Sequence, residues 1–186
     1  MFEIESKYPL EDVDKFESKI IAMGGVAKAS ETHADHYFNH PAKDFAETGE
    51  AFRVRMIDGV GHVTYKGKKR DGVVKVRQEI EWQLGGQDVD GKKLRELLVI
   101  LDFRPVAIVR KTRRKFELTH NGADYELTID DAESVGQFAE IERLVETESQ
   151  IDAARRGIED LAVMFGLGLP ETRSYLTMLL QRSDRL

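Results

Sequence analysis

The 186-residue chain contains no cysteine, no apolar run of membrane-spanning length and no excess of basic residues. Without cysteine it has no disulfide, thiolate nucleophile or cysteine-bound metal centre, which agrees with a reducing compartment, and we predict a cytoplasmic protein. A membrane helix needs about 20 consecutive apolar residues, so we expect no membrane partner. The formal net charge of -6 argues against general nucleic-acid binding, because nucleic-acid-binding proteins carry a basic surface.

The sequence also lacks an apolar signal segment, internal repeats, low-complexity tracts and linker-like stretches. It contains 41% apolar and 33% charged residues, a composition typical of a charge-rich globular protein. A chain of this length buries enough apolar surface for a real core. We therefore predict one continuous domain over residues 1–186.

Four segments have the three- and four-residue apolar spacing of amphipathic helices. The first runs from Leu10 and stops at Gly24, and the others are predicted over residues 94–101, 151–165 and 175–180. Most of the remaining sequence alternates with the two-residue period of a β-strand. The predicted strands are residues 2–8, 34–39, 51–57, 62–68, 74–84, 106–118, 123–130 and 137–145.

Short turns such as Asp58-Gly59, Asp71-Gly72 and Asn121-Gly122 separate several of these strands and are hairpin signals. Eight strands joined largely by hairpins predict an α+β fold, with an antiparallel sheet or barrel and helices packed outside it.

Charged side chains occupy one parity of nearly every predicted strand, so they share one face of the sheet. This set comprises Glu3, Glu5, Lys7, Arg53, Arg55, Lys66, Lys68, Lys75, Arg77, Glu79, Glu81, Lys111, Arg113, Lys115, Glu140 and Glu142. The opposite parity is apolar and includes Val54, Val63, Leu127 and Ile141. Trp82 lies on this apolar face, and we expect it to be a core anchor rather than a platform for base stacking.

Two arrangements explain this pattern. An antiparallel sheet commonly has one face in water, which is the simpler explanation. However, the amphipathic helices need an apolar surface, and if they cover the apolar face of the strands, the charged face must point elsewhere. A sheet curled into a barrel would turn the charges inward, where a bound polyanion and a divalent cation would balance them.

The first strand begins with Glu3-Ile4-Glu5-Ser6-Lys7, which places Glu3, Glu5 and Lys7 on one face. Two carboxylates about 7 Å apart suit a hard divalent cation, and a lysine beside them suits a phosphate. By itself the pentad also fits a half-exposed strand with a charged outer face. His33, His36 and His40 are a weaker candidate metal site, because the predicted strand at 35–38 prevents them from sharing a helical face.

Seven short motifs occur in an order that resembles the CYTH proteins, also called triphosphate tunnel metalloenzymes. They are Glu3-Ile4-Glu5-Ser6-Lys7, Asp35-His36-Tyr37-Phe38, Arg53-Val54-Arg55, Thr64-Tyr65-Lys66-Gly67, Arg77-Gln78-Glu79-Ile80-Glu81, Lys111-Thr112-Arg113 and, after Asp130, Gly136-Gln137-Phe138-Ala139-Glu140-Ile141-Glu142. The resemblance implies an eight-stranded antiparallel closed barrel, usually a homodimer, that binds a triphosphate and acts with Mg²⁺ or Mn²⁺.

The resemblance and the chemistry of phosphoryl transfer, which needs positioning and charge neutralisation, suggest roles for individual residues. We expect the triphosphate to be held by Arg53, Arg55, Lys66, Arg77, Lys111 and Arg113. We expect the metal ligands to be Glu3, Glu5, Asp130, Glu140 and Glu142, with Glu79 and Glu81 either ligands or orienting groups. For Lys7 the family suggests a catalytic role, such as activating the nucleophile. Any single basic residue, Arg77 above all, could instead pair with a neighbouring glutamate.

The same architecture serves two reactions. In the class IV adenylate cyclases the ribose 3′-hydroxyl attacks the α-phosphorus of ATP, whereas in the triphosphatases water attacks the terminal phosphorus. The stretch Arg104-Pro105-Val106 and the ending Arg173-Ser174-Tyr175 are similar to the cyclase branch. We therefore expect an adenylate cyclase, with a triphosphatase acting on inorganic, thiamine or nucleoside triphosphate as the alternative. A non-catalytic nucleotide- or polyphosphate-binding module is a third possibility.

Overall fold

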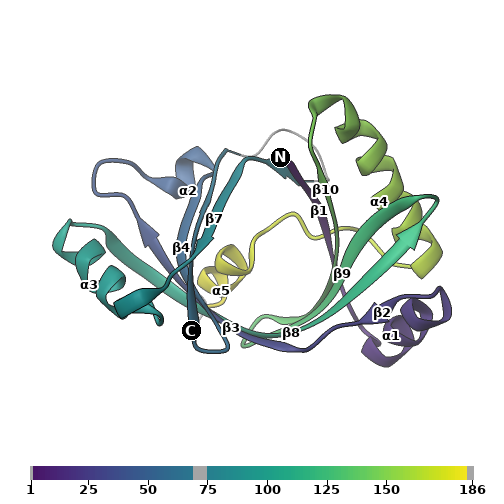
Figure 1. Ribbon diagram of the computed structural model, residues 1–186, viewed down its shortest axis with the longest axis horizontal. Helices are drawn as coiled ribbons and strands as arrows, with labels where there is room; N and C mark the ends of the chain where they lie inside the picture. Colours follow the sequence, from purple (N-terminus) through teal and green to yellow (C-terminus); the bar gives the residue numbers. More distant parts are fainter. Residues whose placement is uncertain (1, 69–74, 184–186) are drawn as a thin grey trace.

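The computed structural model describes residues 2–68 and 75–183, and for residues 75–77 and 183 it describes the backbone alone. Its main feature is a strongly curled antiparallel sheet with helices around it (Figure 1). The described strands are β1 (Phe2–Pro9), β2 (Val26–Ala27), β3 (Glu31–Asn39), β4 (Ala51–Ile57), β5 (Val60–Lys66), β6 (Lys75–Arg77), β7 (Glu79–Gln83), β8 (Arg104–His120), β9 (Ala123–Ala132) and β10 (Gly136–Val145). The α+β fold expected from the alternation is confirmed.

Neighbouring strands follow the order β6-β1-β10-β9-β8-β3-β4-β5-β7, and β2 pairs with β8. The two ends of this order are consecutive in the chain, with only Gln78 between them. One segment therefore pairs with β1 through residues 75–77 and with β5 through residues 79–83, which brings the two edges of the sheet together.

This arrangement corrects the predicted barrel in two ways. The strand predicted at 74–84 is divided at Gln78, and residue 74 and the Asp71-Gly72 turn lie outside the described residues. Within the described residues no ladder joins β6 directly to β7, so the sheet is an incomplete barrel and the closed form was a slight overstatement. The sequence did not reveal this division, because charged residues continue to alternate through Gln78 although the pairing partner changes there from β1 to β5.

Two helices cover the outer, apolar face on one side of the curl, namely α1 (Val13–Ala22) and α4 (Ile151–Phe165) (Figure 1). They bury Ile20, Ile158 and Leu161 against Leu127 and Ile141 of the sheet, and these five side chains are fully buried. Burial on this scale is the main favourable contribution to folding. α4 ends where Gly166 adopts a φ of 70°, a left-handed conformation that glycine takes without strain.

On the other side of the curl, α3 (Lys92–Ile100) packs Leu98 against Phe38 and Val54 (Figure 1). This cluster does not extend over β7. Ile80 and Trp82, on the outer face of β7, are consequently 47% and 52% exposed. The prediction of Trp82 as a core anchor is therefore wrong. Trp82 does lie on the apolar face of its strand, but none of the described helices covers that strand.

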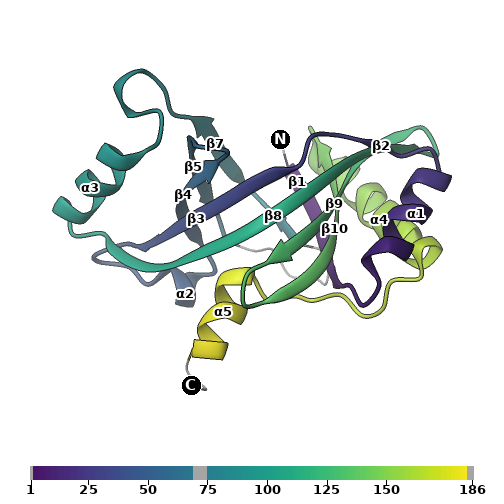
Figure 2. The same ribbon diagram turned by 90° about the horizontal axis from the view of Figure 1, so that it is seen from below.

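The C-terminal helix α5 (Tyr175–Ser183) lies at one end of the barrel, as Figure 2 shows. It packs Tyr175 and Met178 against Val109, Val135 and Phe138. The short helix α2 (Phe45–Thr48) and the 3₁₀ turns η1 (Gly86–Asp88) and η2 (Glu148–Gln150) complete the fold. Among the described residues, every helix is too short or too polar to span a bilayer.

Candidate functional site

The inward-facing parity of the strands encloses a cavity of about 800 Å³. Charged side chains from eight of the described strands line it, with Glu31 from β3 and Glu126 from β9 among them. They include Glu3, Glu5, Lys7, Arg53, Arg55, Lys66, Glu79, Glu81, Lys111, Arg113, Glu140 and Glu142. Asp130 is fully buried in the wall behind them, and the side chain of Arg77 lies outside the described residues. The charged face of the sheet is therefore turned inward and is not a simple solvated surface.

Asp35 of β3 orients two of the predicted phosphate-binding arginines of β4. Its carboxylate accepts hydrogen bonds from Arg55 Nε at 2.7 Å and Nη2 at 2.9 Å, and from Arg53 Nη1 at 3.2 Å. Burial alone would raise the pKa of Asp35, but the charges of Arg53 and Arg55 hold it well below its ordinary value. Asp35 is therefore ionised and holds both guanidinium groups toward the cavity.

The guanidinium of Arg53 uses some of its donors within the wall of the cavity and leaves one without a partner among the described residues. Its Nη1 also donates to Tyr37 Oη at 3.3 Å. Its Nε, in contrast, is buried and has no hydrogen-bond partner among the described residues. A buried donor without an acceptor is costly, and a phosphate oxygen is an acceptor that an arginine binds strongly.

Asp130 of β9 plays the equivalent part on the opposite wall. Its carboxylate accepts from Lys111 Nζ at 2.8 Å, from Arg113 Nε at 2.7 Å and Nη2 at 2.6 Å, and from Tyr175 Oη at 2.9 Å. Arg113 also pairs with Glu140. Despite its burial, Asp130 has a strongly lowered pKa because of the charges of Lys111 and Arg113. The structure therefore places Asp130 and Glu140, both predicted metal ligands, against the basic residues.

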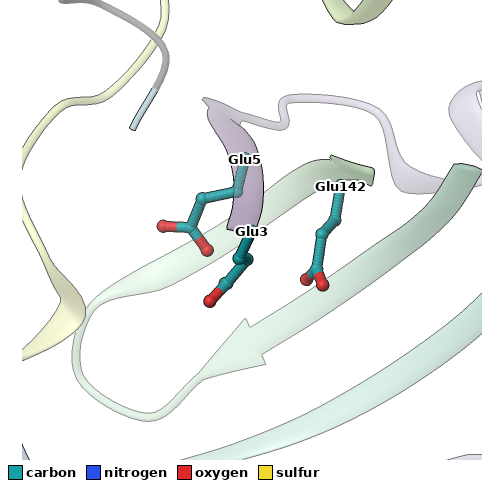
Figure 3. Close-up of side chains that lie close together, drawn as sticks. All are labelled: Glu3, Glu5 and Glu142. Carbon is teal, nitrogen blue, oxygen red and sulfur yellow. The ribbon is translucent and has the colours of Figure 1, made fainter. Parts of the chain in front are cut away.

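Three carboxylates do come together, and all three were predicted as metal ligands. Glu3 and Glu5 of β1 and Glu142 of β10 each offer an oxygen, and these oxygens lie within 4.8 Å of one another (Figure 3). Burial, and then the charges of Glu3 and Glu5, raise the pKa of Glu142 to about 8. The chemistry fits a hard divalent cation, which would relieve the repulsion between the carboxylates.

The remaining predicted carboxylates are engaged at the other edge of the sheet. Lys66 Nζ contacts Glu3 at 2.9 Å and Glu79 at 2.7 Å, which links the basic and acidic groups. Glu81 accepts a hydrogen bond from Thr64 Oγ1 at 2.6 Å. Glu79 and Glu81 lie outside the group of three, so of their two expected roles these contacts favour the orienting one.

Lys7 lies on the same strand as Glu3 and Glu5, with its side chain almost fully buried. Its Nζ donates to the backbone carbonyl of Arg173 at 2.6 Å and lies 4.1 Å from the centre of the Tyr175 ring. The segment that precedes α5 thus reaches into the cavity beside the predicted catalytic lysine.

His33, His36 and His40 do not form a metal-binding group among the described residues. His33 is the one of the three that lines the cavity, and its Nε2 lies 2.8 Å from Glu31 Oε2. Burial, and then the charges of Arg55 and Lys111, lower the pKa of His33 to about 4. It is therefore a neutral polar group in the wall.

Reasoning from the sequence missed the roles of Asp35 and Tyr175, although both stand in motifs that had been identified. The parity of Asp35 opposite Arg53 and Arg55 was a usable signal, because paired antiparallel strands place such residues side by side. No comparable signal existed for Tyr175, which reaches Asp130 across 45 residues of sequence.

Comparisons with known proteins agree with this geometry. The CYTH domain model matches residues 1–175. A Methanocaldococcus jannaschii protein named "Putative adenylate cyclase MJ0240" is 35% identical over 161 residues, which are 87% of this chain and 86% of that protein. An Aeromonas hydrophila protein named "Adenylate cyclase CyaB" is 29% identical over 182 residues, which are 95% of this chain and 88% of that protein.

Among solved structures, the PH1819 protein from Pyrococcus horikoshii OT3 is 36% identical and has a TM-score of 0.85. The match covers 97% of this chain and 99% of that chain, so it extends over the curled sheet, the outer helices and the cavity. The family expected from the seven motifs is thereby confirmed: the chain belongs to the CYTH domain family.

Proposed function

We propose that the protein is a divalent-metal-dependent class IV adenylate cyclase that converts ATP to cyclic AMP and pyrophosphate inside the barrel. One observation carries the proposal: three clustered carboxylates and two carboxylate-oriented basic pairs line the same cavity. Basic groups of this kind bind phosphates, and a cation on the carboxylates would complete the neutralisation of charge. The adenylate cyclase names of two relatives support this choice.

The triphosphate is held by the basic residues of both walls. We assign this role to Arg53, Arg55, Lys66, Arg77, Lys111 and Arg113. The cavity lining supports it, because Arg53, Arg55, Lys66, Lys111 and Arg113 all face the same space. Asp35 and Asp130 hold these groups in place before the substrate arrives, which reduces the cost of ordering them.

Glu3, Glu5 and Glu142 are the proposed ligands of Mg²⁺ or Mn²⁺. When bound, such an ion would supply positive charge and polarise a phosphate oxygen. Glu140 and Asp130 orient the basic groups instead, and Glu79 and Glu81 position Lys66 and Thr64.

Lys7 is the proposed catalytic residue. Its ammonium lies beside the attacking oxygen. It stabilises the negative charge that develops there as the 3′-hydroxyl loses its proton to water, the oxygen bonds to the α-phosphorus, and the bond from that phosphorus to the pyrophosphate leaving group breaks. The position of Lys7 supports this role, since the strand period sets it about 7 Å beyond Glu5 on the same face.

A nucleotide is favoured over inorganic triphosphate by the apolar part of the cavity wall. This part includes Phe45, Phe52, Val106, Leu176 and Leu180. Inorganic triphosphate has no apolar portion to place there, whereas a nucleoside base has. We also propose that the chain works as one domain. The family model matches residues 1–175, and residues from β1 to α5 line this one cavity.

The alternative is a triphosphatase, and a tunnel that binds without turnover is the third candidate. The triphosphatase is supported by the fact that the described ionic groups suit phosphate and metal and do not single out adenine. Purified protein incubated with ATP or inorganic triphosphate, with Mg²⁺ or Mn²⁺, separates the three. Cyclic AMP indicates the cyclase, orthophosphate the hydrolase, and tight binding without product the binding module.

Two substitutions test the residue roles. Lys7→Ala and Glu5→Ala are expected to abolish turnover and to leave the circular dichroism spectrum unchanged. Full activity in either variant would show that the catalytic assignment is wrong. The homodimer implied by the family is a separate prediction, which analytical ultracentrifugation checks.

A further inference from the structure

We propose that Tyr175, the first residue of α5, is a positioning residue for Lys7 and that its role therefore goes beyond packing the helix against the barrel. The inference rests on the proposed function, because it concerns the ammonium group to which catalysis is assigned. It extends that function to a residue at the end of the family match, far in sequence from Lys7.

The contact between the two side chains is direct. Lys7 Nζ lies 4.1 Å from the centre of the Tyr175 ring and 5.6 Å from that of Phe138. The same Tyr175 ring lies 5.1 Å from Lys111 Nζ. An aromatic face attracts ammonium groups most strongly where water is excluded, and Lys7 is 2% exposed. One ring thus faces the proposed catalytic lysine and one of the proposed phosphate-binding lysines.

Tyr175 is itself held from several directions. Its hydroxyl donates to Asp130 Oδ2 at 2.9 Å, and its ring packs edge-on against Phe138 with 5.3 Å between centroids. Burial, and then the negative charges of Glu140 and Asp130, keep the pKa of the hydroxyl well above its ordinary value, so the group remains a donor. A fixed ring defines one position for the ammonium, whereas a lysine side chain alone has many rotamers.

The backbone beside Tyr175 contacts Lys7 as well. The carbonyl of Arg173 accepts from Lys7 Nζ at 2.6 Å, and the amide of Glu171 donates to the Lys7 carbonyl at 2.7 Å. The carbonyl and the ring both attract the ammonium without neutralising its charge. The segment 171–175 therefore holds both the main chain and the side chain of Lys7.

A purely structural role for Tyr175 makes a different prediction, because Met178 anchors the same helix in the same cluster. If α5 only needs to be packed, Met178→Ala should reduce turnover as much as removal of the Tyr175 ring. If the ring positions Lys7, loss of the ring should act on kcat, and Tyr175→Phe, which keeps the ring, should restore most of it.

The experiment compares kcat, KM and thermal stability of wild type, Y175F, Y175L and M178A on the triphosphate that the wild type turns over. We expect Y175L to lose about tenfold to a hundredfold in kcat, with KM within about threefold of wild type, because misplacing a catalytic group by about 1 Å has effects of this size. Y175F is expected to stay within about threefold of wild type, and M178A to lower Tm with little change in kcat.

The inference is overturned if Y175L keeps wild-type kcat, if Y175F is as impaired as Y175L, or if M178A matches Y175L. Should Y175L fail to fold by circular dichroism, Y175M replaces it, since methionine fills the space and lacks the aromatic face. A wild-type protein without turnover on any triphosphate would instead overturn the proposed function itself, so the two failures are distinguishable.

Discussion

At the scale of single residues, two buried aspartates hold the basic side chains that line the cavity. The aspartates themselves are not among the lining residues. Asp35 binds Arg53 and Arg55, and Asp130 binds Lys111 and Arg113. Buried cations without such partners would repel one another and would be costly to desolvate. Each aspartate therefore keeps a pair of like charges close together before an anion arrives.

We predict that Asp35→Asn destabilises the fold by about 3–5 kcal/mol, because it leaves two buried guanidinium groups without a counter-charge. Urea denaturation measures the loss. Asp152→Asn is the matched control, since Asp152 forms an exposed pair with Arg155 and its loss should cost less than about 1 kcal/mol. Equal stability of the two variants would contradict the role given to Asp35.

A second residue-scale prediction concerns pH. Burial, and then the charge of Arg113, lower the pKa of Lys111 to about 8. A lysine with a lowered pKa loses its proton as the pH rises through that value, so the attraction for an anionic triphosphate weakens above about pH 8. We expect KM to rise on the alkaline side in wild type. In Lys111→Arg the rise should disappear, because a guanidinium stays charged. An identical alkaline rise in both proteins would assign it to another group.

The sequence indicated which residues face the cavity but not which of them meet. The alternation in each strand places Asp130, Glu140 and Glu142 on the inward side, and the family resemblance together with the chemistry of phosphoryl transfer led us to expect all three to bind metal. Only Glu142 joins Glu3 and Glu5, since Asp130 and Glu140 reach Arg113 first. Strand periodicity determines the face of a side chain, whereas contacts across a barrel depend on strand tilt and curvature.

At the scale of elements, α4 is packed so closely on the sheet that it requires a glycine. A Cβ at Gly157 would lie 2.0 Å from the hydroxyl oxygen and 3.1 Å from Cζ of Tyr125, a buried residue of β9. Glycine in a helix interior normally weakens the helix by up to about 1 kcal/mol relative to alanine. Here the close approach of helix and strand outweighs that preference.

We therefore predict that Gly157→Ala destabilises the protein by about 1–3 kcal/mol, although it raises helix propensity. Ala153→Gly, at an exposed position of the same helix, measures propensity alone and should cost about 1 kcal/mol. Urea denaturation of both variants provides the test, and a Gly157→Ala variant more stable than wild type would show that the contact is loose. Activity per folded molecule should not change.

Elements differ in how well a sequence predicts them. α1, α3 and α4 were predicted because each repeats its apolar spacing over two or more turns, and α5 was predicted as a shorter helix over residues 175–180. α2 has four residues and β2 has two, which is too short for any period to emerge. The division of β6 from β7 was also missed, because Lys75, Arg77, Glu79 and Glu81 keep the same parity across Gln78. Only the pairing partners reveal it.

At the scale of the whole molecule, the acidic group joins distant parts of the chain, since Glu3 and Glu5 come from β1 and Glu142 from β10. We predict that Mn²⁺ raises the Tm of wild type by several degrees, because a ligand bound only to the folded state stabilises it. Glu142→Gln should remove this shift and should make the metal-free protein more stable, since it relieves repulsion among three clustered carboxylates. Differential scanning calorimetry measures both effects.

Glu81→Gln serves as the control, because Glu81 bonds to Thr64 and lies outside the acidic group. The Mn²⁺-dependent shift should persist in this variant. Loss of the shift in Glu81→Gln, or its survival in Glu142→Gln, would place the cation elsewhere in the barrel.

The pairing of β1 with β10 also has a consequence for biosynthesis. Phe2 lies opposite Val145, so β1 can pair with this neighbour only after the whole segment between them has been translated. Contacts so distant in sequence are slow to form, and in the meantime the edge of β1 that pairs with β10 exposes its backbone to other nascent chains. The acidic group therefore cannot be complete until β10 has been synthesised, because β1 supplies Glu3 and Glu5 and β10 supplies Glu142.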